Sequence, residues 1–156
     1  LQDALREAVE DAGKTGQPIC FVFVDIDHFK QINDEYGHHA GDEALSTVAR
    51  HTRQRLRAND IVGRYGGDEL VLGLVNTTLP NAVGVAEQLR QLIVDQPLQI
   101  DGRRITINLS LGVAELAPGD GYEKLLKRAD EALYASKAAG RGRVSSQPPQ
   151  LETTAP

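Results

Sequence analysis

Residues 64–75 read "RYGGDELVLGLV", and two adjacent acids, Asp68 and Glu69, stand where an apolar run begins. A second strand-like run, "DIVGRY" at 60–65, precedes the two glycines. A glycine pair between two such runs is typical of a β-hairpin, whose primed turn requires positive φ angles. The segment therefore predicts two antiparallel strands with both acids at the turn. Because neighbouring carboxylates repel each other, we expect a positive charge close to them.

Strands and helices interleave on both sides of this hairpin. The apolar run "PICFVFVDI" at 18–26 predicts a buried strand, and the alternating run at 104–114 predicts another. Apolar spacing and terminal residues predict helices over about 1–12, 28–37, 40–57, a stretch opened by Pro80, and about 122–137. Asp27 is expected to cap the short helix at 28–37. A hairpin among these elements indicates an α/β (α+β) fold, with a mixed central sheet and packed helices.

Length and composition indicate one globular domain over residues 1–145, followed by a tail at 146–156 whose composition is typical of disorder. A net charge of −5 argues against a nonspecific nucleic-acid binder, which needs a basic surplus to neutralise phosphates. The single cysteine, Cys20, cannot form an internal disulfide, so a reducing, cytoplasmic location is expected. Apolar runs fall short of the roughly 18 residues of a membrane span. Because the chain contains no methionine, we expect it to start within a longer gene product or to have been trimmed.

Three acids are candidates for a metal site. Asp25 ends the first predicted strand, and Asp68 and Glu69 lie at the hairpin turn. If the hairpin pairs beside the first strand, these carboxylates converge with no obvious lysine between them, an arrangement that suits Mg²⁺. Two such ions could stabilise an in-line displacement at phosphate. The helix start at residues 28–30 would offer free N–H groups to a phosphate.

Taken singly, these residues also fit structural roles. Asp68 and Glu69 could be solvated turn residues, and Arg57 and Asp60 could form a surface ion pair of little energetic value. Lys137 could simply complement a helix dipole. The spacing of single residues does not decide between these alternatives.

Three separated blocks, taken together, resemble the GGDEF domain family of diguanylate cyclases. They are "VDIDHFKQINDEYGHHAGDEAL" at 24–45, "RANDIVGRYGGDEL" at 57–70 and "LLKRADEALYASKAAGRGRV" at 125–144. The resemblance implies a fold similar to the adenylyl cyclase core and the polymerase palm. It also implies that two GTP molecules are joined into cyclic di-GMP, with release of pyrophosphate, by a homodimer that uses Mg²⁺ or Mn²⁺.

The resemblance assigns residues to each part of that reaction. The metal ligands would be Asp25, the carbonyl of Ile26, Asp68 and Glu69, and the last two would also be catalytic. The amides that bind phosphate would be those of His28, Phe29 and Lys30. The remaining substrate contacts would be Asn33 and Asp42 to guanine, and Lys137 and Arg141 to the triphosphate. A carboxylate such as Asp42 can accept from guanine N1–H and the exocyclic amine together, a pair that adenine lacks.

The same resemblance identifies Arg57 and Asp60 as an RxxD site at which cyclic di-GMP would bind and inhibit. Two departures bear on activity: the signature ends in Leu70 rather than Phe, and the initial "DxLTGLxNRR" segment is absent. A third bears on the affinity for cyclic di-GMP, because Gln88 stands where many inhibitory sites have a further arginine. We therefore expect an N-terminally truncated domain that follows a sensory or receiver domain in the full-length protein, which can be membrane-anchored. The alternative function is a weak or inactive module that senses GTP or cyclic di-GMP.

Overall fold

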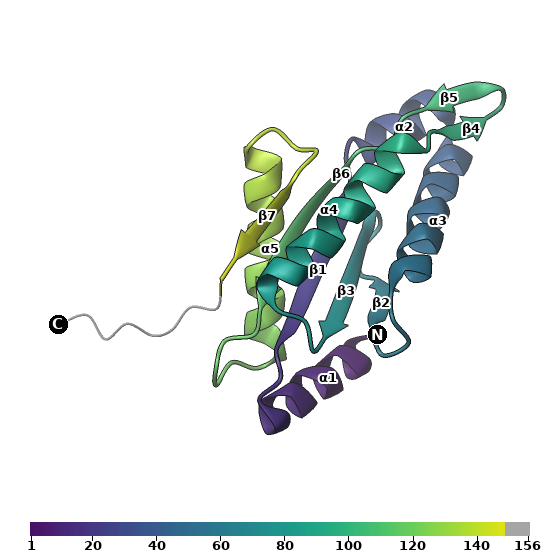
Figure 1. Ribbon diagram of the computed structural model, residues 1–156. Helices are drawn as coiled ribbons and strands as arrows, with labels where there is room; N and C mark the ends of the chain where they lie inside the picture. Colours follow the sequence, from purple (N-terminus) through teal and green to yellow (C-terminus); the bar gives the residue numbers. More distant parts are fainter. Residues whose placement is uncertain (149–156) are drawn as a thin grey trace.

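A five-stranded sheet forms the centre of the protein in a computed structural model that describes residues 1–148 (Figure 1). The elements in chain order are α1 (Gln2–Thr15), β1 (Ile19–Ile26), α2 (Phe29–Tyr36), α3 (His38–Arg55), β2 (Ile61–Arg64), β3 (Glu69–Val75), α4 (Leu79–Asp95), β4 (Leu98–Ile100), β5 (Arg103–Ile105), β6 (Leu109–Glu115), α5 (Tyr122–Ala138) and β7 (Val144–Gln147). None of the helices in residues 1–148 is both long and apolar enough to cross a membrane.

The sheet is mixed, as predicted, and its strand order is β2-β3-β1-β6-β7. β1 lies at the centre and pairs antiparallel with β3 and β6, whereas β7 runs parallel to β6. All eight residues of β1 are buried, because helices cover both faces of the sheet. Val22 and Val24 pack with α3 and α4, whereas Phe21 and Phe23 pack with α1 and α5. Burial on both faces explains why the sequence of β1 is continuously apolar rather than alternating.

The hairpin of β2 and β3 is confirmed, but the primed turn is wrong. Tyr65 N donates to Glu69 O at 2.9 Å, so residues 66–68 make a three-residue connection. Neither Gly66 nor Gly67 has a positive φ, because the longer connection reverses the chain without one. The guanidinium of Arg64 donates to Gly66 O and Gly67 O at 3.2 and 2.7 Å and holds the connection in place.

The strand expected over 104–114 is two strands in different sheets. β5 pairs with β4 in a separate two-stranded sheet, and β6 begins after residues 106–108. The apolar alternation nevertheless continues through the break, because Ile105, Ile107 and Leu109 all enter the same core cluster. The alternation of apolar residues predicts which face of a segment is buried, but it does not predict which sheet the segment joins.

Structure extends further at both ends than the sequence indicated. α1 continues to Thr15 and ends at Gly16, which adopts the left-handed conformation that closes many helices. β7 reaches Gln147, so residues 146–147 belong to the sheet rather than to a tail. Pairing with β6 satisfies the backbone there, and Ser136 Oγ donates to Ser145 Oγ at 2.8 Å. The rest of the predicted tail, 149–156, lies outside the described residues.

Candidate active site

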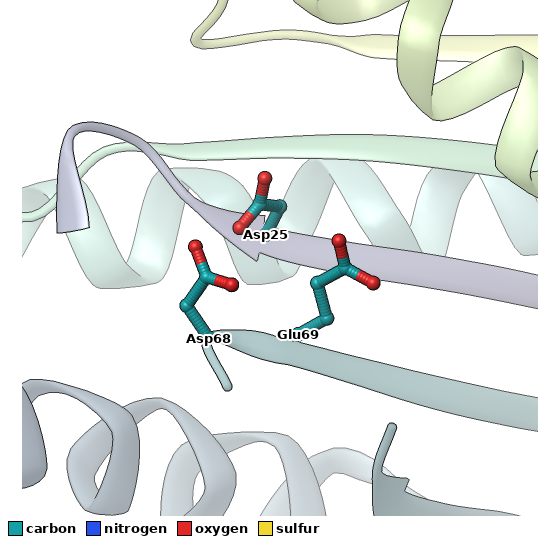
Figure 2. Close-up of side chains that lie close together, drawn as sticks. All are labelled: Asp25, Asp68 and Glu69. Atoms are coloured by element: carbon teal, nitrogen blue, oxygen red, sulfur yellow. The ribbon is translucent and has the colours of Figure 1, made fainter. Parts of the chain in front are cut away.

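Three carboxylates meet at one edge of the central sheet (Figure 2). Asp25, near the end of β1, is paired in register with Glu69, the first residue of β3. Asp68 precedes Glu69 in the hairpin connection. Each of the three acids offers an oxygen that lies within 4.8 Å of the oxygens of the other two. The antiparallel register of β1 and β3 is thus sufficient to bring these acids together.

The arrangement of these acids fits a divalent metal. Asp25 is only 4% exposed, and its Oδ1 is buried without a hydrogen-bond partner among residues 1–148. Burial of a carboxylate oxygen that lacks a hydrogen-bond partner destabilises the fold unless a ligand binds to that oxygen. Carboxylates are the oxygen ligands that Mg²⁺ and Mn²⁺ prefer.

A lysine lies against these acids, as expected from the repulsion between neighbouring carboxylates, although the sequence offered no obvious lysine between them. Lys137, in the last turn of α5, forms an ion pair with Oδ2 of Asp25. The sequence could not indicate this contact, because α5 reaches the acids only after packing across β6 and β1. Lys137 therefore supplies the positive charge that was expected to offset the repulsion between Asp68 and Glu69.

Burial and charge perturb the pKa values of this cluster. Burial raises the pKa of Asp25 to about 7, with a further contribution from Asp68, although Lys137 acts to lower it. Burial also raises the pKa of Glu69. The burial of Lys137 acts to lower its own pKa, but the hydrogen bond and charge of Asp25 outweigh this effect and leave it raised. Perturbed pKa values of this kind cluster at functional sites.

The candidate phosphate-binding segment adjoins the acids. His28 precedes α2 in a left-handed conformation, and Phe29 and Lys30 begin the helix. The predicted cap by Asp27 is wrong, because no side chain caps α2. The amides of the first turn of a helix without such a cap are open to an anion.

Asp27 has a different role, which local sequence reasoning missed. It is buried, its Oδ1 accepts from Ser110 Oγ at 2.6 Å, and its Oδ2 accepts from the amide of Gly142 at 2.9 Å. These bonds tie the start of α2 to the loop that carries Arg141. Arg141 itself has a φ of 66°, an uncommon conformation for a residue other than glycine. No local signal could reveal this network, because its partners come from β6 and from the loop after α5.

The two candidate guanine contacts come from neighbouring helices. Asn33 lies on α2, and its side chain packs against Gly41 in α3. Asn33 Oδ1 is buried without a hydrogen-bond partner among the described residues. Asp42, the residue after Gly41, is exposed.

Arg57 and Asp60 lie at the opposite end of β3 from the acids. The side chain of Asp60 is 4% exposed, and its carboxylate accepts from the amides of Arg57 and Val75 at 3.0 and 3.1 Å. Arg57 Nη2 donates to Val75 O and to Thr77 Oγ1 at 2.6 and 2.7 Å, and the ion pair itself spans 3.4 Å. The pair therefore braces the end of β3. The Arg57 side chain is nevertheless 61% exposed and accessible to a ligand.

Known proteins are similar to this chain in sequence and in fold. A family model described as "Diguanylate cyclase, GGDEF domain" matches residues 1–143. Diguanylate cyclase DgcP of Pseudomonas aeruginosa is 38% identical over 144 residues, 92% of this chain and 22% of that protein. The response regulator PleD of Caulobacter vibrioides is 41% identical over 143 residues, 90% of this chain and 32% of that protein. The chain thus spans less than a third of the length of these two relatives.

Solved structures agree with this assignment. The GGDEF domain of DgcB from Caulobacter crescentus in complex with c-di-GMP superposes with a TM-score of 0.89 at 33% identity, over 92% of this chain and 86% of that one. The active GGEEF domain of a diguanylate cyclase from Vibrio cholerae gives 0.88 at 35% identity, over 94% and 93%. The chain belongs to the GGDEF domain family of diguanylate cyclases.

Proposed function

We propose that this domain joins two GTP molecules into cyclic di-GMP with release of two pyrophosphates. The main observation behind the proposal is the cluster of Asp25, which is buried, with Asp68 and Glu69, which are half-buried. It lies beside Lys137 and next to the uncapped start of α2. Metal ligands, a cation and free amides are the groups that phosphoryl transfer requires, because its catalysis is mostly positioning and charge stabilisation.

Each residue acts on a defined part of the substrate. Asp25, Ile26 through its carbonyl, Asp68 and Glu69 would hold Mg²⁺ or Mn²⁺. The bound ion would stabilise negative charge on the phosphates. The amides of His28, Phe29 and Lys30 bind phosphate oxygens, and Lys137 and Arg141 bind the triphosphate. Asn33 and Asp42 hold guanine.

The reaction needs two substrates in opposed orientations. The 3′-hydroxyl of one GTP releases its proton to solvent as its oxygen bonds to the α-phosphorus of the other GTP, and the bond from that phosphorus to the pyrophosphate breaks. A second, equivalent step closes the ring. Because each domain holds one GTP, we propose that two domains face each other about a two-fold axis.

Leu70, which stands where the family signature has phenylalanine, is compatible with turnover. It is 3% exposed, pairs with Val24 in the sheet and belongs to the core beneath α3 and α4. A leucine fills such an apolar site as phenylalanine would, and it bears no group that the chemistry uses.

We further propose that cyclic di-GMP inhibits through Arg57 and Asp60, which lie away from the acids at the far end of β3. Arginine can donate to guanine O6 and N7 together. For this to occur, the exposed Arg57 guanidinium must exchange its bonds to Val75 O and Thr77 Oγ1 for bonds to the ligand.

The decisive experiment incubates the protein with GTP and Mg²⁺ and separates the products by chromatography. Cyclic di-GMP should form, and the Asp68→Asn variant should not form it at a comparable rate. Binding of GTP without any product from the unsubstituted protein would contradict the proposed activity and favour the sensor alternative.

A further inference from the structure

We propose that Gly41 is a positioning residue for the base, because its missing side chain leaves the space that the Asn33 carboxamide occupies. The inference rests on the proposed function, since it concerns the guanine site. Gly41 is buried in the first part of α3. A Cβ at this position would lie 2.7 Å from Cγ and 3.0 Å from Nδ2 of Asn33, and closer still to Oδ1.

The backbone does not explain a glycine at this position. Gly41 lies within a helix and has no positive φ, so any L-residue could adopt its conformation. Glycine in a helix is less favourable than alanine because it loses more conformational freedom on folding. The contact with Asn33 is what excludes a side chain.

The contact also differs from that of a glycine needed for close backbone packing. A Cβ on Gly112 in β6 would meet backbone atoms of Ala129, Ala132 and Leu133 in α5, which cannot move independently. The three atoms nearest to a Cβ on Gly41 all belong to the side chain of Asn33, which can rotate away. Substitution of Gly41 should therefore displace Asn33 and leave the fold intact.

The position of Asn33 depends on shape rather than on hydrogen bonds. Its Oδ1 is buried and has no hydrogen-bond partner among residues 1–148. Packing against Gly41 is thus a principal restraint on the carboxamide. Gly41 is also bonded directly to Asp42, the second proposed guanine contact. One short segment of α3 therefore sets the relative placement of both groups.

A displaced Asn33 should weaken the binding of GTP without altering the reacting groups. The acids and Lys137 lie on β1, β3 and α5, and neither Asn33 nor Gly41 touches them in the contacts described. Loss of an interaction made equally in the ground state and the transition state raises KM and leaves kcat unchanged. We expect Gly41→Ala to raise KM for GTP about ten-fold, with kcat within about two-fold of the unsubstituted value.

The test is a double-mutant cycle of the unsubstituted protein, Gly41→Ala, Asn33→Ala and the double variant. If Gly41 acts through Asn33, the double variant should have the KM of Asn33→Ala alone, because the space is then free. The midpoint of thermal unfolding should likewise be higher in the double variant than in Gly41→Ala. Gly84→Ala is the matched control, since a Cβ there meets nothing within 4 Å in helix α4. Its KM should be unchanged.

Multiplication of the two single effects on KM in the double variant, or an unchanged KM in Gly41→Ala, would overturn the inference. Failure of the unsubstituted protein to make cyclic di-GMP would be a different result, because it contradicts the proposed function. In that case calorimetric affinity for GTP replaces KM across the same cycle, and the same comparison decides the role of Gly41.

Discussion

The ammonium of Lys137 forms an ion pair with Oδ2 of Asp25, so the last turn of α5 supplies a cation to the acids at the ends of β1 and β3. The other oxygen of Asp25 is buried and has no partner among residues 1–148. Without a metal, Lys137 therefore offsets part of the charge of the cluster. With a metal, the lysine and the ion would share one carboxylate, and their like charges would repel.

Substitution Lys137→Met should change the affinities for metal and for GTP in opposite directions. Metal alone should bind more tightly, by on the order of ten-fold, because a competing positive charge is lost. KM for GTP should rise, because the triphosphate loses a cationic contact. Calorimetric titration with Mn²⁺ without nucleotide, followed by steady-state kinetics, measures both.

Lys127→Met is the matched control for this substitution, because Lys127 lies on the same helix but is exposed. Lys127→Met should change neither the affinity for Mn²⁺ nor KM for GTP. Weaker metal binding in Lys137→Met than in the unsubstituted protein would contradict the competition.

Stability without metal should depend on pH through Asp25. Its pKa rises from 3.8 to about 7 on folding, mainly through burial, so the folded protein holds a proton that the unfolded chain releases between these values. The free energy of unfolding should therefore fall as pH increases from about 4 to about 7. The raised pKa of Glu69 acts in the same direction.

Asp25→Asn isolates this contribution, since an amide does not titrate. Urea unfolding of both proteins in a chelator, across that pH range, should show the variant gaining stability relative to the unsubstituted protein as pH rises. A difference in stability between the two proteins that stays constant from about pH 4 to about pH 7 would show that Asp25 is not perturbed in this way.

Asp68→Asn should abolish most of the turnover and leave the fold intact. The substitution removes one charged ligand from a site where phosphate charge must be stabilised, which should lower kcat by on the order of 10²-fold or more. The circular dichroism spectrum should be unchanged, because Asp68 lies in the hairpin connection and packs in neither core cluster. Mg²⁺ should also raise the unfolding midpoint less in this variant. A kcat close to the unsubstituted value would refute the catalytic assignment.

The acids could be predicted together from sequence because their positions follow from local patterns. A continuously apolar β1 ends near Asp25, and a hairpin begins β3 at Glu69, so antiparallel pairing alone makes these residues neighbours. The mixed sheet follows from the same hairpin. Periodicity also identified α3, α4 and α5, since each buries one stripe of apolar residues.

The features of the fold and the site that could not be predicted depend on contacts between segments that are distant in the sequence. The ion pair of Lys137 with Asp25 joins the end of α5 to β1, and the bond from Gly142 to Asp27 joins the loop after α5 to the start of α2. No local pattern encodes either contact. Asp27 looked like a helix cap because capping preference is local, but the burial of its carboxylate by β6 and the loop after α5 decided its role. The end of β7, residues 146–147, resembled a disordered tail because the four residues of the strand, "VSSQ", have little apolar character of their own.

Arg57 and Asp60 should respond differently to alanine. Arg57→Ala should weaken the binding of cyclic di-GMP and relieve product inhibition, with little change in the initial rate, because the guanidinium is exposed and far from the acids. Asp60→Ala should also destabilise the fold, by about 1–3 kcal/mol, because the amide of Val75 loses its buried acceptor.

Calorimetry with cyclic di-GMP and urea unfolding of the two variants separate these effects. Equal affinity for cyclic di-GMP in Arg57→Ala and the unsubstituted protein would refute a binding role and leave only the structural brace at the end of β3. Asp60→Ala serves as the stability comparison, since Arg57→Ala removes no acceptor from a buried amide.

The last prediction concerns assembly. The chain brings together one cluster of acids, one uncapped start of α2 and one pair of candidate guanine contacts, so each domain is expected to hold one GTP. Cyclic di-GMP is two-fold symmetric, and each 3′-oxygen must reach the α-phosphorus of the opposite substrate. Two facing domains satisfy both steps with one isologous contact. Turnover should then require an encounter of two loaded domains, whose effective concentration limits the rate.

The rate per subunit should accordingly rise with protein concentration. Where monomer dominates, it should increase about in proportion to concentration, and it should level off once dimers accumulate. Turnover measured across a dilution series, with sedimentation in parallel, tests this dependence. Mixing Asp68→Asn with the unsubstituted protein provides the control, because mixed dimers carry one damaged site and cannot complete both bonds efficiently. Constant activity per subunit at dilutions where only monomer sediments would contradict the facing arrangement, because one domain would then complete both steps alone.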